Sequence, residues 1–193
     1  MTARTHDVAA LTLLMTIVIF SPPGNMTVAT ALAAVLANQL GGIAPDIDQP
    51  TAPLWRNLPV GRYVGKIFGA LVGGHRFLSH SLLGVGVFAV LARLALEFFQ
   101  PMMPRIDIGF VWFAFVIGMV SHLIMDTFTK EGVPWLLPLP FKIGIPPLKA
   151  WRITTGKGVE MYIILPLLII ITVWLASTHY TVLSQIVQTK LVQ

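Results

Sequence analysis

The sequence has 193 residues, of which 55% are hydrophobic and only 11% are charged. Soluble globular domains carry about a quarter of their residues as charges, so this composition excludes an ordinary cytosolic domain and a disordered tail. The absence of cysteine excludes disulfides, thiolate catalysis and cysteine-ligated metal sites. A net charge of +5 is typical of loops beside an anionic membrane leaflet. The expected partner is therefore the lipid bilayer, and no nucleic acid is expected.

Five apolar segments predict an all-α, polytopic transmembrane helical bundle that forms one integral-membrane domain over residues 1–193. The expected spans cover residues 8–20, 26–44, 81–99, 108–128 and 161–177. The first segment is short, because a crossing needs about 20 apolar residues. A signal peptide is the alternative for this segment, but no small-residue cleavage site precedes the next hydrophobic run. We treat it as a short first helix, and whether it crosses fully stays open.

Two further segments are apolar without spanning. Residues 63–74 are glycine-rich and too short to cross alone, which predicts a re-entrant or interfacial segment. The later loop carries Trp135, Phe141 and Trp151 among prolines and lysines, a mixture typical of a loop at the lipid interface. A lid over the bundle with no preference for lipid is the alternative for this loop.

The distribution of positive charge predicts the orientation. Five crossings place the N-terminus and the loops 45–79 and 129–160 on one side, and this side holds ten of the thirteen basic residues. The positive-inside rule then predicts a multi-pass membrane protein with its N-terminus in the cytoplasm.

Eight histidines and carboxylates fall at this same predicted cytoplasmic end of the bundle. They are His6, Asp46, Asp48, His75, His80, His122, Asp126 and Glu160. The long loops also lie at this end, and polar residues are common in loops regardless of function. For Asp46, Asp48, His75 and Glu160 taken singly, simple solvation in a loop is therefore an open alternative.

His122 and Asp126 interrupt an otherwise apolar span. An ionisable residue there costs about 2.5–3.5 kcal/mol at mid-helix and less near the end, so such residues usually serve a function. Their spacing of four places both on one helix face, where they can reach one metal ion or one proton path. A purely structural His/Asp pair is the alternative.

The remaining candidates require particular local structures. His75 and His80 lie about 140° apart on a continuous helix, so joint metal binding requires a break, which Ser79 can supply as a helix cap. Prolines on both sides keep Asp46 and Asp48 out of a helix, and on an extended stretch both carboxylates point to the same side.

Imidazole and carboxylate ligands without thiolate suit Zn, Mn, Fe or Mg, and several histidines favour a transition metal, with Zn foremost. A set this large suits one or two divalent ions, which can activate water for a phosphoryl or acyl displacement. The expected metal ligands are His6, His75, His80, His122 and Asp126. We expect Asp46, Asp48 and Glu160 to act as catalytic base, additional ligand or support for a ligand.

At these residues the sequence resembles the YdjM-type family of membrane-bound, metal-dependent hydrolases, LexA-binding proteins of the inner membrane. The shared strings are TH at 5–6, PDID at 45–48, HRFLSHSL at 75–82, SHLIMDTFT at 121–129, GV at 132–133 and Glu160. The family usually has Gly-Xaa-Thr-His where this chain has Phe77-Leu78-Ser79-His80. The resemblance covers nearly the whole chain and implies a polytopic α-helical membrane protein with metal-dependent hydrolase activity.

The leading prediction is a membrane-embedded hydrolase that acts on a lipid-like, amphipathic ester or phosphoester through a metal-activated water. A metal or proton transporter that uses the same His/Asp cluster is the alternative. A third hypothesis is a structural membrane protein in which the metal only cross-links the fold. The substrate, the metal and the oligomeric state stay open.

Overall fold

The structure, a computed structural model, describes residues 1–24, 26–52, 55, 58–71, 76–139 and 141–188. Over these residues it is helical and contains no β-strand. The α-helices are α1 (Ala3–Phe20), α2 (Val28–Ile43), α4 (Gly61–Leu71), α5 (Leu82–Phe99), α6 (Ile108–Thr127), α7 (Leu165–Thr178) and α8 (Tyr180–Gln188). Short 3-10 segments are η1 (Ala44–Asp48), η2 (Leu78–His80), η3 (Gln100–Met102) and η4 (Lys149–Trp151), and a π-helical turn, η5 (Glu160–Ile164), leads into α7.

Five segments in the described residues are long and apolar enough to cross a membrane. They are Ala3–Phe20, Val28–Asp48, Leu82–Met102, Ile108–Thr127 and Glu160–Thr178. The predicted all-α bundle with five spans is thus confirmed. Helix α1 begins at Ala3 rather than at residue 8 because the polar Thr5 and His6 are buried inside the bundle and belong to the helix.

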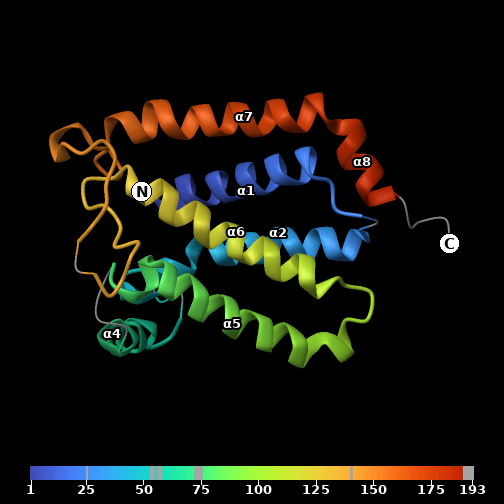
Figure 1. Cartoon of the computed structure of the whole chain (residues 1–193), viewed down its shortest axis with the longest axis horizontal. Helices are drawn as coiled ribbons and strands as arrows, with labels where there is room; N and C mark the ends of the chain where they lie inside the picture. The colour runs from blue at the N-terminus through green and yellow to red at the C-terminus, as the bar shows by residue number, and fades with distance from the viewer. Residues whose placement is uncertain (25, 53–54, 56–57, 72–75, 140, 189–193) are drawn as a thin grey trace.

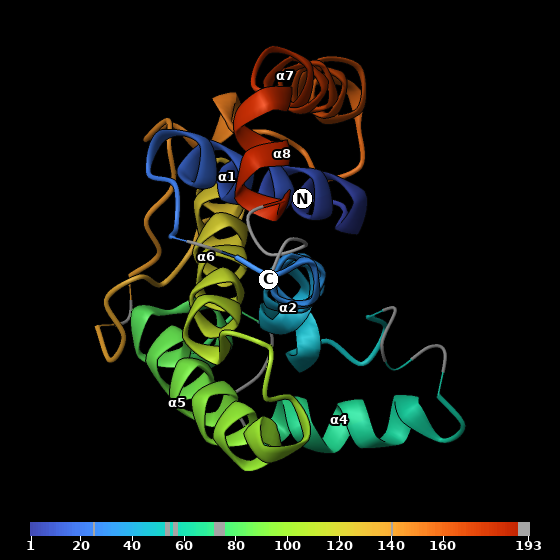
Figure 2. The ribbon, with the colours of Figure 1, turned by 90° about the vertical axis from the view of Figure 1, so that its right-hand side faces the viewer.

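The long helices run side by side along the long axis of the molecule (Figure 1). Helix α6 packs against α1, α2 and α5, while α7 packs on α1 at one edge. Exposed apolar side chains such as Leu94 on α5 and Ile170 on α7 cover the outward faces, as expected where lipid surrounds the bundle. Helix α4 lies across this axis: it is seen end-on in Figure 1 and along its length in Figure 2.

Small residues bring α2 and α6 into close contact at the centre of the bundle. A Cβ atom on Gly41 would lie 2.0 Å from the carbonyl oxygen of Phe115, and one on Gly118 would lie 2.1 Å from that of Asn38. The Asn38 side chain donates a hydrogen bond of 3.1 Å to the carbonyl of Ala114 on α6. Close backbone approach through small residues is a common way for membrane helices to associate. It fixes the spacing between α6, which carries His122 and Asp126, and α2, whose continuation η1 carries Asp46.

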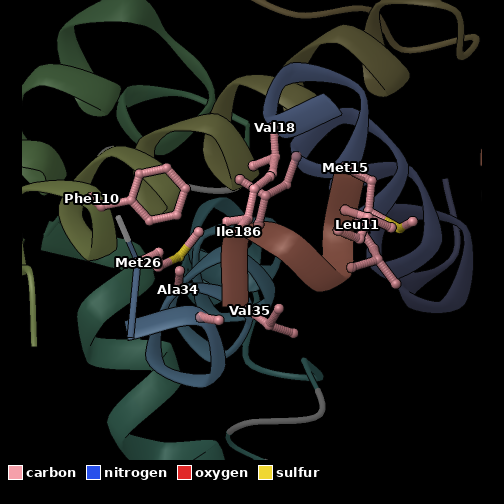
Figure 3. A pocket seen from close by; sticks show the side chains of 11 residues that line it. Leu11, Met15, Val18, Met26, Ala34, Val35, Phe110 and Ile186 are labelled. Atoms are coloured by element: carbon pink, nitrogen blue, oxygen red, sulfur yellow. The ribbon is translucent and has the colours of Figure 1, made fainter. Parts of the chain in front are cut away.

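The two ends of the bundle differ in chemistry. At the end away from the first residue, a cavity of about 150 Å³ lies between α1, α2, α6 and α8 (Figure 3). Its lining is apolar and includes Met15, Val18, Met26, Phe110 and Ile186. This end offers hydrophobic contact, whereas the histidines and carboxylates described below lie at the opposite end.

Two local predictions near the site were wrong. Asp46 and Asp48 do not lie on an extended stretch, because Ala44–Asp48 continues α2 as a 3-10 turn. Pro45 is the second residue of this turn, and because it has no N–H it makes one fewer backbone hydrogen bond to the end of α2. Helix α5 is capped by Ser81, whose hydroxyl accepts from the Gly84 backbone N–H at 3.0 Å, and not by Ser79.

The loop after α6 folds back over the polar end of the bundle. Val133 and Ile143 exchange backbone hydrogen bonds of 2.9 Å, and Trp135 donates from its indole nitrogen to Thr127 on α6 at 2.8 Å. Trp151 is 74% exposed. The predicted group of interfacial aromatics is thus divided between an inward anchor, Trp135, and outward side chains at Trp151 and Phe141.

Candidate metal centre

Five of the predicted site residues meet at the polar end of the bundle. They come from α1 (His6), η1 (Asp46), η2 (His80) and the last two turns of α6 (His122 and Asp126). They form two overlapping groups, one of His6, His122 and Asp126 and one of Asp46, His80 and His122, and in each group the potential ligand atoms lie within 4.8 Å of one another. His122 belongs to both groups.

The distances between potential ligand atoms suit metal coordination better than direct hydrogen bonds. Asp46 Oδ1 lies 3.6 Å from His80 Nε2 and 3.7 Å from His122 Nε2. Asp126 Oδ2 lies 3.7 Å from His122 Nε2, and Asp126 Oδ1 lies 3.3 Å from His6 Nε2. Two ligand atoms bound tetrahedrally at about 2.1 Å from one zinc ion would be about 3.4 Å apart. The observed spacing is close to this value.

His122 is held in one orientation by the neighbouring helix. Its Nδ1 lies 2.6 Å from the backbone carbonyl oxygen of Gly42 on α2, and a carbonyl can only accept, so Nδ1 carries the proton. Nε2 therefore presents a lone pair to the centre of the cluster. A carbonyl behind an imidazole is a frequent arrangement around metal-binding histidines.

Several buried nitrogens in the cluster make no hydrogen bond. These are both ring nitrogens of His6 and Nε2 of His122, and the two rings stack with centroids 3.7 Å apart. A buried polar atom without a hydrogen bond costs about 1–3 kcal/mol, so such atoms are rare in folded proteins. A divalent ion would satisfy one nitrogen of each ring, and the residues therefore fit a metal site.

Asp48 supports His80 from behind. The Ser79 hydroxyl donates to Asp48 Oδ2, which also accepts from the backbone N–H of Arg76 at 3.0 Å. Because the only hydroxyl proton of Ser79 is used in this way, its oxygen accepts from His80 Nδ1, which lies 3.0 Å away. Burial is the largest influence on the pKa of His80 and lowers it, but hydrogen bonds and charge from Asp46 and Asp48 outweigh burial and raise the pKa above its ordinary value.

The 3-10 geometry of η1 explains why the two aspartates have different partners. Side chains two residues apart in a 3-10 turn point about 120° away from each other. Asp46 therefore faces Nε2 of His80, while Asp48 lies 3.5 Å from Nδ1 on the other edge of the ring. The sequence predicted that the carboxylates of Asp46 and Asp48 point to the same side, whereas in the structure they lie at opposite edges of the His80 ring.

Sequence reasoning missed Arg76, which was counted only as a loop charge. Its side chain is buried, its NH2 pairs with Asp126 Oδ2, and its NH1 donates to Thr129 Oγ1 at 3.0 Å and to the Gly132 carbonyl at 3.4 Å. The amino group of Met1 also contacts Asp126 Oδ1. A basic residue inside the polar string at 75–82 was the available signal, but its backbone φ of +58° was not foreseeable.

Among the described residues, Asp48 and Glu160 are the predicted site residues that are not in the donor groups. Glu160 is buried, and its carboxylate accepts hydrogen bonds from the Thr2 backbone at 2.6 Å, the Thr5 hydroxyl at 2.7 Å and the Gly156 backbone at 2.7 Å. It therefore joins the start of α1 to the start of the last span. His75 lies outside the described residues, so its predicted role as a ligand stays a prediction.

Comparison with known proteins places this geometry in context. The sequence profile of a family described as "YdjM inner membrane protein" matches residues 1–188. Proteins named "Inner membrane protein YdjM" from Escherichia coli (strain K12) and Shigella flexneri are each 31% identical to the chain over 128 residues, which is 66% of this chain and 59% of the relative. "Uncharacterized protein YvsG" from Bacillus subtilis (strain 168) is 30% identical over 108 residues, 55% of this chain and 58% of the relative. The chain thus covers less than two-thirds of the length of these curated relatives, and no solved structure matches it.

Proposed function

We propose that this chain, which belongs to the YdjM family of inner membrane proteins, is a metal-dependent hydrolase acting on a lipid-linked or amphipathic ester or phosphoester. The observation that carries the proposal is the buried set of imidazole nitrogens without hydrogen bonds, contributed by His6 and His122 and grouped with the carboxylate of Asp126. Imidazole and carboxylate ligands favour Zn²⁺, with Mn²⁺, Fe²⁺ or Mg²⁺ as alternatives.

The two donor groups suit one or two ions. His6, His122 and Asp126 would hold one ion, and Asp46 and His80 would complete a second position that shares His122. When bound, a divalent ion polarises an ester or phosphoester oxygen and lowers the pKa of water enough to provide a nucleophile at neutral pH.

Residues of the protein would accept the proton of the attacking water and hold the metal ligands in place. The side chain of Asp46 is 25% exposed, whereas those of His80 and His122 are buried, so Asp46 is the carboxylate that water or substrate reaches first. We assign Asp46 the role of proton acceptor or accessible ligand. Asp48 fixes the His80 ring through Ser79, and Arg76 fixes the Asp126 carboxylate, so both act as positioning residues.

The depth of the cluster favours a substrate that is itself part of the membrane. The donor residues lie at the ends of membrane-spanning segments, where η1, the last turns of α6 and the loop after α6 meet. A lipid or amphipathic molecule presents its ester or phosphoester bonds at this level. We further propose that this end faces the cytoplasm, because the N-terminus and the two long loops carry ten of the thirteen basic residues.

Transport of a metal ion or a proton is the second candidate. Transport requires polar groups along a path to the far side of the membrane. In the described residues, the far half of the bundle is lined by an apolar cluster that includes Leu14, Val18, Met26 and Ala114. We therefore place hydrolysis first.

The first experiment is elemental analysis of the purified full-length protein. We expect at least one equivalent of a divalent ion in the wild type and a loss of most of it in a His122→Ala, Asp126→Ala double variant. His179→Ala is the matched control, because His179 is partly exposed at the far end of α7 and should leave the metal content unchanged.

The second experiment measures hydrolysis of a panel of lipid esters and phosphoesters by the wild type, before and after chelation. Turnover that chelation abolishes and the identified ion restores would support the proposal. In the first experiment, equally low metal content in the wild type and in the His122→Ala, Asp126→Ala double variant would refute the proposed metal-dependent function. Ion uptake into proteoliposomes without turnover of any lipid would favour transport instead.

A further inference from the structure

Helix α4 is an element that the proposed hydrolase site does not use. It lies across the direction of the membrane-spanning helices, at the end of the bundle that holds the His/Asp cluster (Figures 1 and 2). A helix in this orientation runs parallel to the membrane surface when the spans cross the bilayer. Interfacial helices of this kind bury an apolar face at the headgroup boundary and present basic residues to anionic lipid.

Glycines fix the face that α4 turns toward the protein. Gly61, Gly65 and Gly69 recur at every fourth position and are buried. A Cβ atom on Gly65 would lie 2.6 Å from Cδ1 of the Trp55 indole, and one on Gly69 would lie 2.5 Å from the carbonyl oxygen of Asp48. The inward face of α4 therefore contacts the backbone of a residue that supports the His/Asp cluster.

The outward face combines apolar and basic side chains. Tyr63 is 70% exposed, Val64 48% and Ile67 64%. Arg62 and Lys66, four residues apart, lie together on one flank of the helix, and both are exposed. The sequence has no acidic residue between Asp48 and Glu97, so α4 carries positive charge and no negative charge of its own.

An open cavity of about 680 Å³ lies beside this basic flank. Its lining includes Pro50, Trp55, Tyr63, Arg62 and Lys66, so apolar and aromatic walls meet two cationic side chains. The volume falls within the range of about 300–1,000 Å³ that is usual for small-molecule sites. The amphipathic lining matches a ligand that is anionic at one end and apolar at the other.

We propose that α4 and this cavity bind the headgroup of an anionic phospholipid, with the phosphate between Arg62 and Lys66 and the acyl chains on the side of Tyr63 and Ile67. The lipid headgroup is then held one helix away from the His/Asp cluster, through the contact of Gly69 with Asp48. This lipid site stands whether or not the cluster is a hydrolase, because it uses none of the metal-binding residues.

The depth of α4 can be measured directly, because the chain has no native cysteine. Single-cysteine variants Ile67→Cys and Arg62→Cys of the full-length protein are spin-labelled and reconstituted in phosphatidylcholine vesicles with and without phosphatidylglycerol. We expect the label at position 67 to be accessible to oxygen from the hydrocarbon, and the label at position 62 to be accessible to a water-soluble relaxation agent. Full water accessibility at both positions would overturn the proposal.

Lipid selectivity is the second readout. We expect the wild type to bind spin-labelled phosphatidylglycerol in preference to phosphatidylcholine, and Arg62→Gln, Lys66→Gln to reduce this preference by about fivefold for each charge removed. The matched control Lys149→Gln, Lys157→Gln removes two exposed charges from the loop after α6 and should keep the preference. An equal loss in both double variants, or displacement of the lipid by soluble glycerol phosphate, would contradict a specific lipid site at α4.

Discussion

Substitution of Gly118 by alanine tests whether the close approach of α2 and α6 builds the metal centre. The added Cβ would lie 2.1 Å from the carbonyl oxygen of Asn38 and 2.8 Å from the backbone nitrogen of Gly42. Both atoms belong to the backbone of α2, so no side-chain rotation relieves the overlap. The helices must separate by about 1 Å, and overpacking of this kind costs about 1–3 kcal/mol. We expect a loss of stability near the upper end of this range.

The same displacement should weaken metal binding without removing any ligand. The Gly42 carbonyl is 2.6 Å from His122 Nδ1, and Asp46 on the continuation of α2 is 3.7 Å from His122 Nε2. A metal site tolerates errors of only about 0.2 Å in its ligand distances. We therefore expect Gly118→Ala to lose most of its bound metal.

The assay is equilibrium unfolding of the purified protein in mixed detergent micelles, followed by circular dichroism and combined with elemental analysis. Gly86→Ala is the control, because a Cβ there meets no atom within 4 Å. An alanine inside an α-helix is favoured over glycine by about 0.5–1 kcal/mol, so this variant should be as stable as the wild type or slightly more stable. If Gly118→Ala and Gly86→Ala unfold at the same proportion of denaturing detergent and retain equal amounts of metal, the close α2–α6 contact does not build the metal centre.

Three further substitutions separate structural from chemical roles. Glu160→Gln should lower the free energy of unfolding by about 1.5–3 kcal/mol, because it weakens the hydrogen bonds that the carboxylate accepts. It should leave the metal content unchanged. A loss of metal would place Glu160 among the ligands. Asp126→Asn, assayed without metal, should destabilise by about 3 kcal/mol, the lower end of the range for a broken buried pair, because the buried Arg76 guanidinium then faces the exposed Glu131 carboxylate, 3.4 Å from its Nε, in place of a buried partner. A cost below about 1 kcal/mol would contradict the pairing of Arg76 with Asp126. Trp135→Phe should lower the free energy of unfolding by about 1 kcal/mol, because the indole hydrogen bond is lost. Trp151→Phe, at an exposed position, should change it by less than about 0.5 kcal/mol. Equal effects of the two substitutions would argue against Trp135 as an inward anchor.

The membrane architecture could be predicted from the sequence because hydropathy acts locally. A span is recognised in the sequence as a run of about 20 apolar residues. The proximity of His122 and Asp126 follows from their spacing of four on one helix. The positions of α5 and α6 were accordingly predicted to within one residue at each end. The gathering of polar residues at one end followed from the number of crossings.

The division of roles among the polar residues required non-local information. Asp46 and Asp48 have different partners because η1 is a 3-10 turn, and this turn is stabilised by packing that no two-residue pattern encodes. Arg76 reaches Asp126 across more than forty positions of sequence through a backbone conformation with positive φ. Glu160 accepts from Thr5 at the other end of the chain.

The sequence by itself determined the class of protein, the five spans and the end of the bundle where histidines and carboxylates collect, since these depend on composition and helical periodicity. The tertiary structure decided which atoms face one another. The α2–α6 contact sets the tautomer of His122, and the packing of α1, η1 and η2 places His6, Asp46 and His80 beside His122. It also placed α4 across the bundle, where the glycines of the helix pack closely against Trp55 and the backbone of Asp48.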